Sequence, residues 1–344
     1  MATGVVYDEI FLAHDHPGHP ESRVRLESIL KLLRQAGVWD RLQPVAARQA
    51  TREELTRVHR WSYVEQVRAL SERGGGHLDP DTYVNRASYQ AALMAAGGLI
   101  ETCRGVLEGR VRNAFALVRP PGHHAMPAQG MGFCLFGNVA LAAYDACYAA
   151  GLQRVLIVDF DVHHGNGTQA MTAEEPAICF ISTHQQPLYP GTGAAREVAH
   201  GRAAGTLVNI PLSPGSGDNV FQAVYEQLVV PIARRFQPEL ILVSAGFDAH
   251  WDDPLAGLTL SLGGYHWLVR TLIGLAEELC AGHIIFALEG GYHLQVLSYG
   301  VLNTFRALLG EEGYEDSLGP CPWPGEPEVT SYLTTLRRLH GLEA

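Results

Sequence analysis

The sequence predicts an α/β protein in which a parallel β-sheet carries helices on both faces. Two observations support this. Short apolar segments of strand length alternate with longer segments of helical periodicity along most of the 344 residues, and strands that alternate with helices pair in parallel. Several of the strand-like segments also end in glycine, proline or ionisable residues, and ligands bind at the carboxyl ends of parallel strands.

The expected strands lie at residues 5–7, 114–118, 155–159, 178–182, 207–211, 240–245 and 284–288. In this order they read VVY, AFALV, VLIVD, ICFIS, LVNIP, LILVSA and IIFAL. Continuous apolar runs of this kind are typical of strands that helices cover on both faces. The expected helices lie between them, where apolar residues recur three and four positions apart, at residues 26–35, 88–107, 139–149, 219–236, 264–280 and 294–308.

Composition limits the classes of function. Acidic residues outnumber basic ones by 36 to 25, the formal net charge is -11, and no lysine or arginine cluster is present, which argues against nucleic-acid binding. No apolar run approaches 18 residues and no signal peptide is evident, so we expect a cytoplasmic protein without a membrane span. The six cysteines form no CxxC pair and are expected to be reduced. Without a linker or repeat, residues 1–344 are expected to form one domain.

The segment that follows strand 155–159 alternates carboxylate, apolar and imidazole side chains. It reads Asp159, Phe160, Asp161, Val162, His163. Residues two apart on a strand share a face, so the two aspartates and the histidine can converge. Such ligands suit a divalent metal. The alternative is a polar strand end that only caps the following helix.

Three further segments favour a functional site over that alternative. The first segment, RPPGHH at 119–124, follows the expected strand 114–118 and contains His123 and His124. The second follows strand 240–245 and ends in Phe247 and Asp248. The third follows strand 284–288 and reads Glu289-Gly290-Gly291-Tyr292. A single such segment could be a structural loop. Four of them at equivalent ends of parallel strands indicate a ligand-binding crevice.

These motifs resemble those of the histone deacetylase family. RPPGHH, Gly132-Phe133-Cys134, DFDVHHGNGT, YPGTG, SAGFDAHWDDPLAGL and LEGGY occur in the order and at about the spacing of the family, from His14 to about Leu309. The chain is most similar to class II-type members and their bacterial relatives. The resemblance implies the arginase/deacetylase fold, with an eight-stranded parallel sheet, and a single deacetylase-like catalytic domain.

The resemblance also implies two metal sites. Asp161, His163 and Asp248 match the ligands of the catalytic metal. Carboxylate and imidazole without thiolate accept Zn²⁺, the metal that the family implies, but also Fe²⁺ or Co²⁺. A structural potassium ion is implied at a second site, formed by Asp159, Asp161, His163, Ser182 and Thr183.

The implied reaction is amide hydrolysis by a metal-activated water. His124 matches the general base, with Asn166 behind it, and His123 matches its neighbour, backed by Asp159. Because a neutral partner raises an imidazole pKa less than a carboxylate does, His124 is expected to be the less basic histidine. Tyr292 matches the residue that stabilises the oxyanion.

A substrate slot is implied as well. Phe133 and Tyr189 match its two aromatic walls, and Tyr189 departs from the phenylalanine often found there. Gly132, Gly291 and Leu255 match other substrate-contacting positions, and an apolar Leu255 favours peptides over polyamines. Arg25 matches an arginine near a product channel, although a surface arginine is nearly as plausible. Asp81 lies near the position of a rim aspartate and is left unassigned because the local alignment shifts by a residue or two.

Three alternatives to an acyl-lysine deacetylase remain. An acetylpolyamine amidohydrolase would use the same chemistry on acetylated small amines. A ureohydrolase of this fold would need further aspartates for a second metal, yet Gly165 stands two residues after His163. A catalytically silent acyl-lysine binder would be expected to lack Tyr292 or one of the tandem histidines. Physiological substrate, acyl-chain length, native metal and oligomeric state stay open, and neither nucleic acid nor a membrane is an expected partner.

Overall fold

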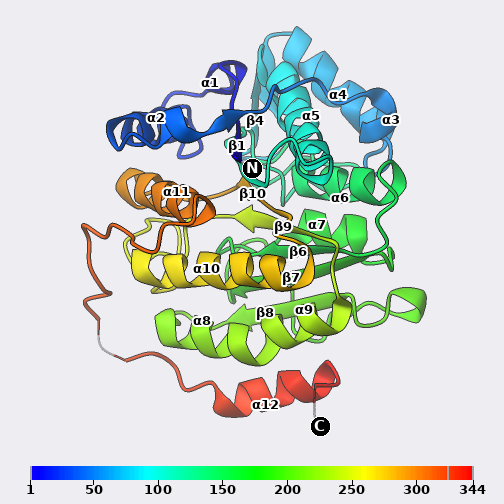
Figure 1. Cartoon of the computed structure of the whole chain (residues 1–344). Coiled ribbons are helices and arrows are strands. Elements are labelled where there is room, and N and C mark those ends of the chain that lie inside the picture. Colours follow the sequence, from blue (N-terminus) through cyan, green and yellow to red (C-terminus); the bar gives the residue numbers. More distant parts are fainter. Residues whose placement is uncertain (1, 324, 343–344) are drawn as a thin grey trace.

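Eight parallel strands form the central sheet of the protein, described here from a computed structural model that covers residues 2–323 and 325–342. Their order across the sheet is β2-β1-β5-β10-β9-β6-β7-β8, and every neighbouring pair is parallel (Figure 1). The bounds are β1 (Thr3–Val6), β2 (Gln43–Pro44), β5 (Asn113–Ala116), β6 (Val155–Asp159), β7 (Ile178–Gln185), β8 (Leu207–Leu212), β9 (Leu240–Ala245) and β10 (Ile284–Leu288).

Helices cover both faces of this sheet (Figure 1). One layer contains α5 (Ser88–Leu107), α6 (Asn138–Tyr148) and α7 (Asn166–Thr172). In the other, α2 (Val24–Gln35) packs against α11 (Leu294–Leu308), which packs against α10 (Leu262–Leu279). α8 (Asp218–Val224), a π-helical turn (Tyr225–Val229) and α9 (Val230–Phe236) complete that layer. The central strands are buried along their length, as their continuous apolar sequences predict.

The fold predicted from the sequence is confirmed, with differences at its periphery. The seven expected strands and six expected helical segments are present, although the 219–236 segment contains the π-helical turn. The eighth strand, β2, consists of two exposed residues and leaves no apolar run to detect. Further unpredicted elements are short or polar: α1 (Ile10–Ala13), α3 (Arg52–Leu55), α4 (Trp61–Glu72), α12 (Thr330–Leu339), the 3-10 turns Trp39–Arg41 and Gly201–Ala203, and the hairpin of β3 (Gly75–His77) and β4 (Tyr83–Asn85).

None of the helices in the described part of the chain combines the length and the apolar character that a membrane crossing requires.

Candidate active site

The four polar segments that follow strands β5, β6, β9 and β10 come together because these strands are neighbours in the sheet. β5, β10, β9 and β6 lie side by side in the sheet, and parallel strands bring all their carboxyl ends to one edge. The loops that follow them carry His123 and His124, Tyr292, Asp248, and Asp161 with His163. The predicted crevice is therefore present.

Asp161, His163 and Asp248 form one compact cluster. One ligand atom from each lies within 4.8 Å of the others. The Nδ1 atom of His163 is 3.0 Å from Asp161 Oδ1 and 3.3 Å from Asp248 Oδ2. Both carboxylates are fully buried, and Asp248 Oδ2 has no properly oriented hydrogen-bond donor among the described residues. Two buried carboxylates that face one imidazole nitrogen suit a bound cation.

The convergence of Asp159 with Asp161 and His163 on one strand face, expected from their alternation, is wrong. Strand β6 ends at Asp159, and residues 160–163 follow a bent path. Asp159 turns instead toward His123 Nδ1, which lies 3.1 Å from its Oδ2. Backbone direction changes at the strand end, so the period of two no longer applies there. Asp159 therefore lies behind His123 and outside the cluster of Asp161, His163 and Asp248.

A glycine at position 290 allows the carboxylates to approach. The Gly290 N–H donates to Asp161 Oδ2 at 2.8 Å. A Cβ atom at this position would lie 2.0 Å from Asp248 Oδ2 and 2.5 Å from Asp161 Oδ2. Any side chain at position 290 would thus displace two of the three cluster residues.

The tandem histidines lie beside this cluster with their rings 3.9 Å apart. His124 Nδ1 is 2.7 Å from Asn166 Oδ1. The amide nitrogen of Asn166 faces the sulfur atoms of Met126 and Met131, so the amide oxygen is the group turned toward His124. Because that oxygen can only accept, Nδ1 carries the proton, and His124 Nε2 keeps a free lone pair when the ring is neutral.

The pKa values of the two histidines differ in the expected direction. Burial lowers the pKa of His124 well below its usual value, and the charges of His123 and His163 lower it further. Burial also disfavours protonation of His123, but the carboxylates of Asp161 and Asp159 outweigh this effect and raise its pKa. Because burial lowers both pKa values, the difference comes from the neighbours: the carboxylates of Asp161 and Asp159 raise the pKa of His123, whereas His124 has a neutral partner in Asn166 and the charges of His123 and His163 beside it.

Backbone hydrogen bonds fix the position of Tyr292. The Asp253 carboxylate accepts from the N–H groups of Tyr292 and His293 at 2.8 and 3.2 Å, and from Leu255 at 3.0 Å. Burial raises the pKa of the Tyr292 hydroxyl well above its usual value. Tyr292 is therefore a protonated hydrogen-bond donor over the whole physiological pH range.

A narrow slot of about 240 Å³ leads to these groups. Its walls are aromatic and apolar: the Phe133 ring lies 5.9 Å from that of Tyr292, and the Tyr189 ring lies 5.2 Å from that of His124. The residues that line it are Asp81, His124, Gly132, Phe133, His163, Leu188, Tyr189, Leu255 and Tyr292.

The slot contains most, but not all, of the residues expected there. Gly132, Phe133, Tyr189 and Leu255 line it. A Cβ atom on Gly132, whose φ is +53°, would lie 2.3 Å from His124 Cδ2, so only glycine fits. Gly291 does not line the slot. Its carbonyl accepts a hydrogen bond from Arg25 Nε at 2.8 Å, and its expected contact with a substrate stays a prediction.

Arg25 is a fully buried residue rather than a surface one. Besides the Gly291 carbonyl, its guanidinium binds the Glu289 carbonyl at 2.5 Å and the Glu21 carboxylate at 3.1 Å. Glu21 also pairs with Arg119, and all three of these side chains are inaccessible to solvent. This ionic cluster anchors the loop that carries Tyr292 to helix α2.

Sequence reasoning missed three further contributors. Asp81 lines the slot, but no motif fixed its alignment. The Glu289 carboxylate accepts from the N–H groups of Gly122 and His123 at 2.7 and 3.2 Å, which holds the tandem-histidine loop. Asp253 positions Tyr292 as described above. Glu289 and Asp253 lie within the LEGGY and SAGFDAHWDDPLAGL motifs. Their roles could not be predicted, because a carboxylate that binds backbone N–H groups has no characteristic sequence pattern.

Of the five residues expected at the potassium site, Asp161 and His163 belong to the Asp161/His163/Asp248 cluster, and Asp159 connects to Asp161 through the Asp161 backbone N–H, which donates to Asp159 Oδ1 at 3.1 Å. Asp159 pairs with Ser182 across β6 and β7, and the Thr183 hydroxyl donates to the Asp159 carbonyl at 3.3 Å. Ser182 and Thr183 are fully buried. The potassium ion itself stays a prediction.

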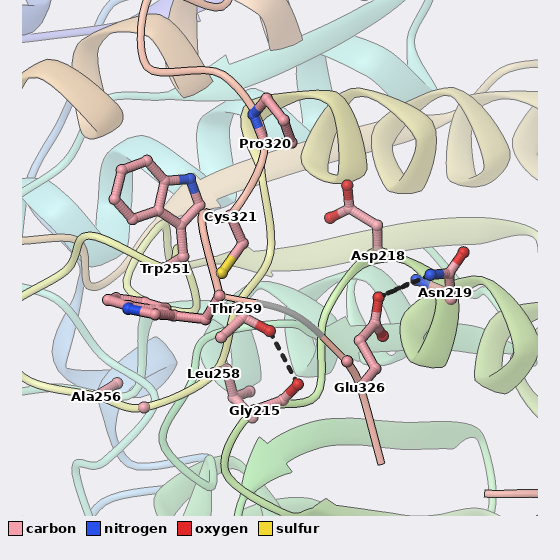
Figure 2. A pocket seen from close by; sticks show the side chains of 13 residues that line it. Gly215, Asp218, Asn219, Trp251, Ala256, Leu258, Thr259, Pro320, Cys321 and Glu326 are labelled. Carbon is pink, nitrogen blue, oxygen red and sulfur yellow. Dashed lines mark hydrogen bonds between the residues drawn. The ribbon is translucent and has the colours of Figure 1, made fainter. Parts of the chain in front are cut away.

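A larger cavity, of about 610 Å³, lies outside the slot. Figure 2 shows Trp251, Cys321 and Asp218 around it, and Glu326 bonded to Asn219. In the described part of the chain, none of the residues that line it belongs to the metal cluster or to the tandem histidines. The smaller slot is therefore the candidate active site.

Comparison with known proteins agrees with this site. Residues 19–308 match the histone deacetylase domain, so the chain belongs to the histone deacetylase family of hydrolases. It is 42% identical to "Histone deacetylase 14, chloroplastic" of Arabidopsis thaliana, over 88% of this chain and 75% of the relative. It is 40% identical to "Histone deacetylase-like amidohydrolase" of Pseudomonas aeruginosa, over 87% and 78%.

The fold comparison gives the same family. The crystal structure of the HDA15 HD domain superposes with a TM-score of 0.90 at 38% sequence identity, covering 98% of this chain and 95% of the other. The arginase/deacetylase fold and the resemblance stated from the sequence motifs are both confirmed.

Proposed function

We propose that the protein is a zinc-dependent amidohydrolase that removes acetyl groups from lysine side chains. The observation that carries the proposal is the meeting of His124, His163 and Tyr292 in one aromatic slot. Phe133 and Tyr189 offer flat walls to an aliphatic stem, and the few polar groups of His124, His163 and Tyr292 can orient the bound group, as in small-molecule sites.

Asp161, His163 and Asp248 would hold the metal. Two buried carboxylates and one imidazole nitrogen fit Zn²⁺, and also Fe²⁺ or Co²⁺. When bound, such an ion supplies Lewis acidity that polarises the acyl carbonyl and lowers the pKa of a water molecule. A structural potassium ion at Ser182 and Thr183, as in the family, belongs to the same proposal.

The chain's own residues would perform the proton transfers. His124 Nε2 accepts a proton from the attacking water, because Nδ1 is committed to Asn166. The Tyr292 hydroxyl donates a hydrogen bond to the carbonyl oxygen as it becomes negative. When the C–N bond breaks, His124 returns the proton to the leaving lysine amine, and acetate and lysine are released. His123, whose pKa is raised by the carboxylates of Asp161 and Asp159, contributes charge and a hydrogen bond.

An acetylpolyamine amidohydrolase is the second candidate, and Asp81 is the observation that favours it. This exposed residue brings a carboxylate to the slot, where an ammonium group could pair with it. Leu255, on the same rim, offers no such partner. An ammonium group beside Leu255 rather than beside the exposed Asp81 would be buried without a counter-charge, which is costly, whereas a peptide leaves its charges outside the slot. We therefore favour acetyl-lysine in a protein or peptide.

A ureohydrolase or a silent binder fits less well. A second group, His123, Cys134 and Glu289, brings potential ligands together. However, Glu289 binds backbone amides and His123 binds Asp159, so these side chains already have partners. That leaves one metal cluster among the described residues, and the complete set of proton-transfer groups argues against a silent binder.

Steady-state kinetics with a panel of substrates tests the proposal. We expect kcat/KM for an acetyl-lysine peptide to exceed that for acetylputrescine or N-acetylspermidine by at least about tenfold, or roughly 1.4 kcal/mol. Leu255→Glu should gain activity toward the polyamines, and Leu255→Gln, the uncharged control of the same size, should not. A higher kcat/KM for an acetylpolyamine in the wild-type protein would replace the first candidate by the second.

A further inference from the structure

The Phe133 wall of the slot is held in an unusual backbone conformation. Its φ angle is +67°, in the left-handed region that side chains other than glycine rarely adopt. The preceding Gly132 also has a positive φ, of +53°. Such a conformation persists only where the surroundings enforce it, so the contacts of this segment decide where the aromatic ring lies.

One of these contacts comes from a residue 51 positions earlier in the chain. The Phe133 N–H donates to the hydroxyl oxygen of Thr82 at 3.0 Å. Thr82 is fully buried. Its own backbone is fixed in a tight turn, because its N–H donates to Asp79 Oδ1 at 2.6 Å and its carbonyl accepts from the Leu78 N–H at 2.9 Å. The hydroxyl is therefore presented from a rigid turn.

His19 connects the same turn to the same aromatic ring. Its imidazole lies edge-on to Phe133, with the ring centres 4.7 Å apart. Its Nε2 lies 2.9 Å from the Asp81 carbonyl oxygen, and because a carbonyl only accepts, Nε2 must donate. The ring's other nitrogen faces the backbone of Glu21. The N-terminal segment, the 79–82 turn and the slot wall thus form one connected unit.

We propose that Thr82, supported by His19, is a positioning residue of the acyl-lysine slot. The Thr82 hydroxyl holds Phe133 in its strained conformation, and the same turn places Asp81 at the slot. Neither Thr82 nor His19 lines the slot itself. They act through Phe133 and Asp81, so their loss affects substrate binding more than the chemical step. The proposal rests on the proposed function for its kinetic readout only.

Thr82→Val tests this, because valine keeps the shape of threonine and removes the accepting oxygen. We expect KM for an acetyl-lysine peptide to rise about tenfold, with kcat within about threefold of wild type. Thr82→Ser restores the oxygen and should restore KM. The matched control is Thr102→Val, also fully buried, whose hydroxyl donates to the Gly98 carbonyl within α5. It should lower stability without changing KM.

A crystal structure of the Thr82→Val protein supplies a readout that does not depend on activity. We expect Phe133 to leave the positive-φ region and its ring to move from the slot wall. An unchanged Phe133, or equal KM values for Thr82→Val and wild type, would overturn the proposal. If the wild-type protein hydrolyses no acetyl-lysine peptide, the proposed function fails, and the crystal structures still decide whether Thr82 positions Phe133.

Discussion

Replacing Glu21 by glutamine should destabilise the protein and slow the reaction together. Glu21 is fully buried, with Nη2 of Arg119 2.7 Å from its Oε2 and Nη1 of Arg25 3.1 Å from its Oε1. Burial alone would raise its pKa, but Arg119 and then Arg25 outweigh burial and lower it to about 2. Glutamine keeps the shape and removes the charge, which leaves two buried guanidinium groups without an anion.

The expected cost follows from this geometry. Breaking a buried ion pair costs about 3 to 5 kcal/mol. Unfolding entropy of about 2.1 cal/mol/K per residue gives roughly 0.7 kcal/mol/K for a chain of 344 residues, so Tm should fall by about 4 to 7 °C. Because Arg25 also binds the carbonyls of Gly291 and Glu289, the Tyr292 loop should loosen and kcat should fall by about tenfold or more.

Thermal unfolding followed by circular dichroism, together with steady-state kinetics, checks both effects. Glu27→Gln is the matched control, since Glu27 lies six residues after Glu21, on helix α2, with its side chain 44% exposed, and pairs with Arg23 at the surface. Its Tm should stay within about 1 °C of wild type. If Glu21→Gln matched that control in Tm and in kcat, the ionic cluster would not support the active-site loop.

Three further predictions concern acid stability, the slot and the metal. Burial lowers the pKa of His59 to about 4 in the folded protein. Because the unfolded chain gains its proton near pH 6.5, His59 should contribute about 3 kcal/mol to the stability lost as pH falls from 6.5 to 4; the loss measured by urea unfolding should be smaller by about this amount in His59→Gln than in wild type. Gly132→Ala should lower kcat/KM by tenfold or more, because its Cβ would meet His124; wild-type kinetics would contradict this. The protein should retain about one divalent ion per chain, and Asp248→Asn should lose it, by elemental analysis; two tightly bound ions would favour the ureohydrolase alternative.

The sequence predicted the elements whose pattern is strong. Strands such as 155–159 and 240–245 are continuous apolar runs, and the chemistry-bearing residues follow them directly, so both the sheet and its functional edge could be found. β2 and the β3–β4 hairpin could not, because two or three residues with exposed or mixed side chains carry no periodicity.

Site residues divide along a similar line. Those proposed to bind a metal or the substrate, such as Asp161, His163 and His124, are polar groups just after strand ends, so the sequence pattern indicated them. Residues that act on the backbone were not. Asp253 and Glu289 bind N–H groups, and Arg25 binds carbonyls, and any position near the loops could supply such a contact. The bend after Asp159 could not be predicted either, because side chains alternate between two faces only within a strand, and β6 ends at Asp159.

Acetate release from an acetyl-lysine peptide, compared between wild type and Tyr292→Phe, tests the central claim most directly. The hydroxyl removed is the proposed oxyanion donor, and the phenyl ring keeps the slot wall that faces Phe133. We predict measurable turnover by the zinc-loaded wild-type protein and a fall in kcat of roughly 10² to 10³ in the variant, with peptide affinity within a few-fold. Equal turnover by the two proteins, or none by the wild type, would contradict the account.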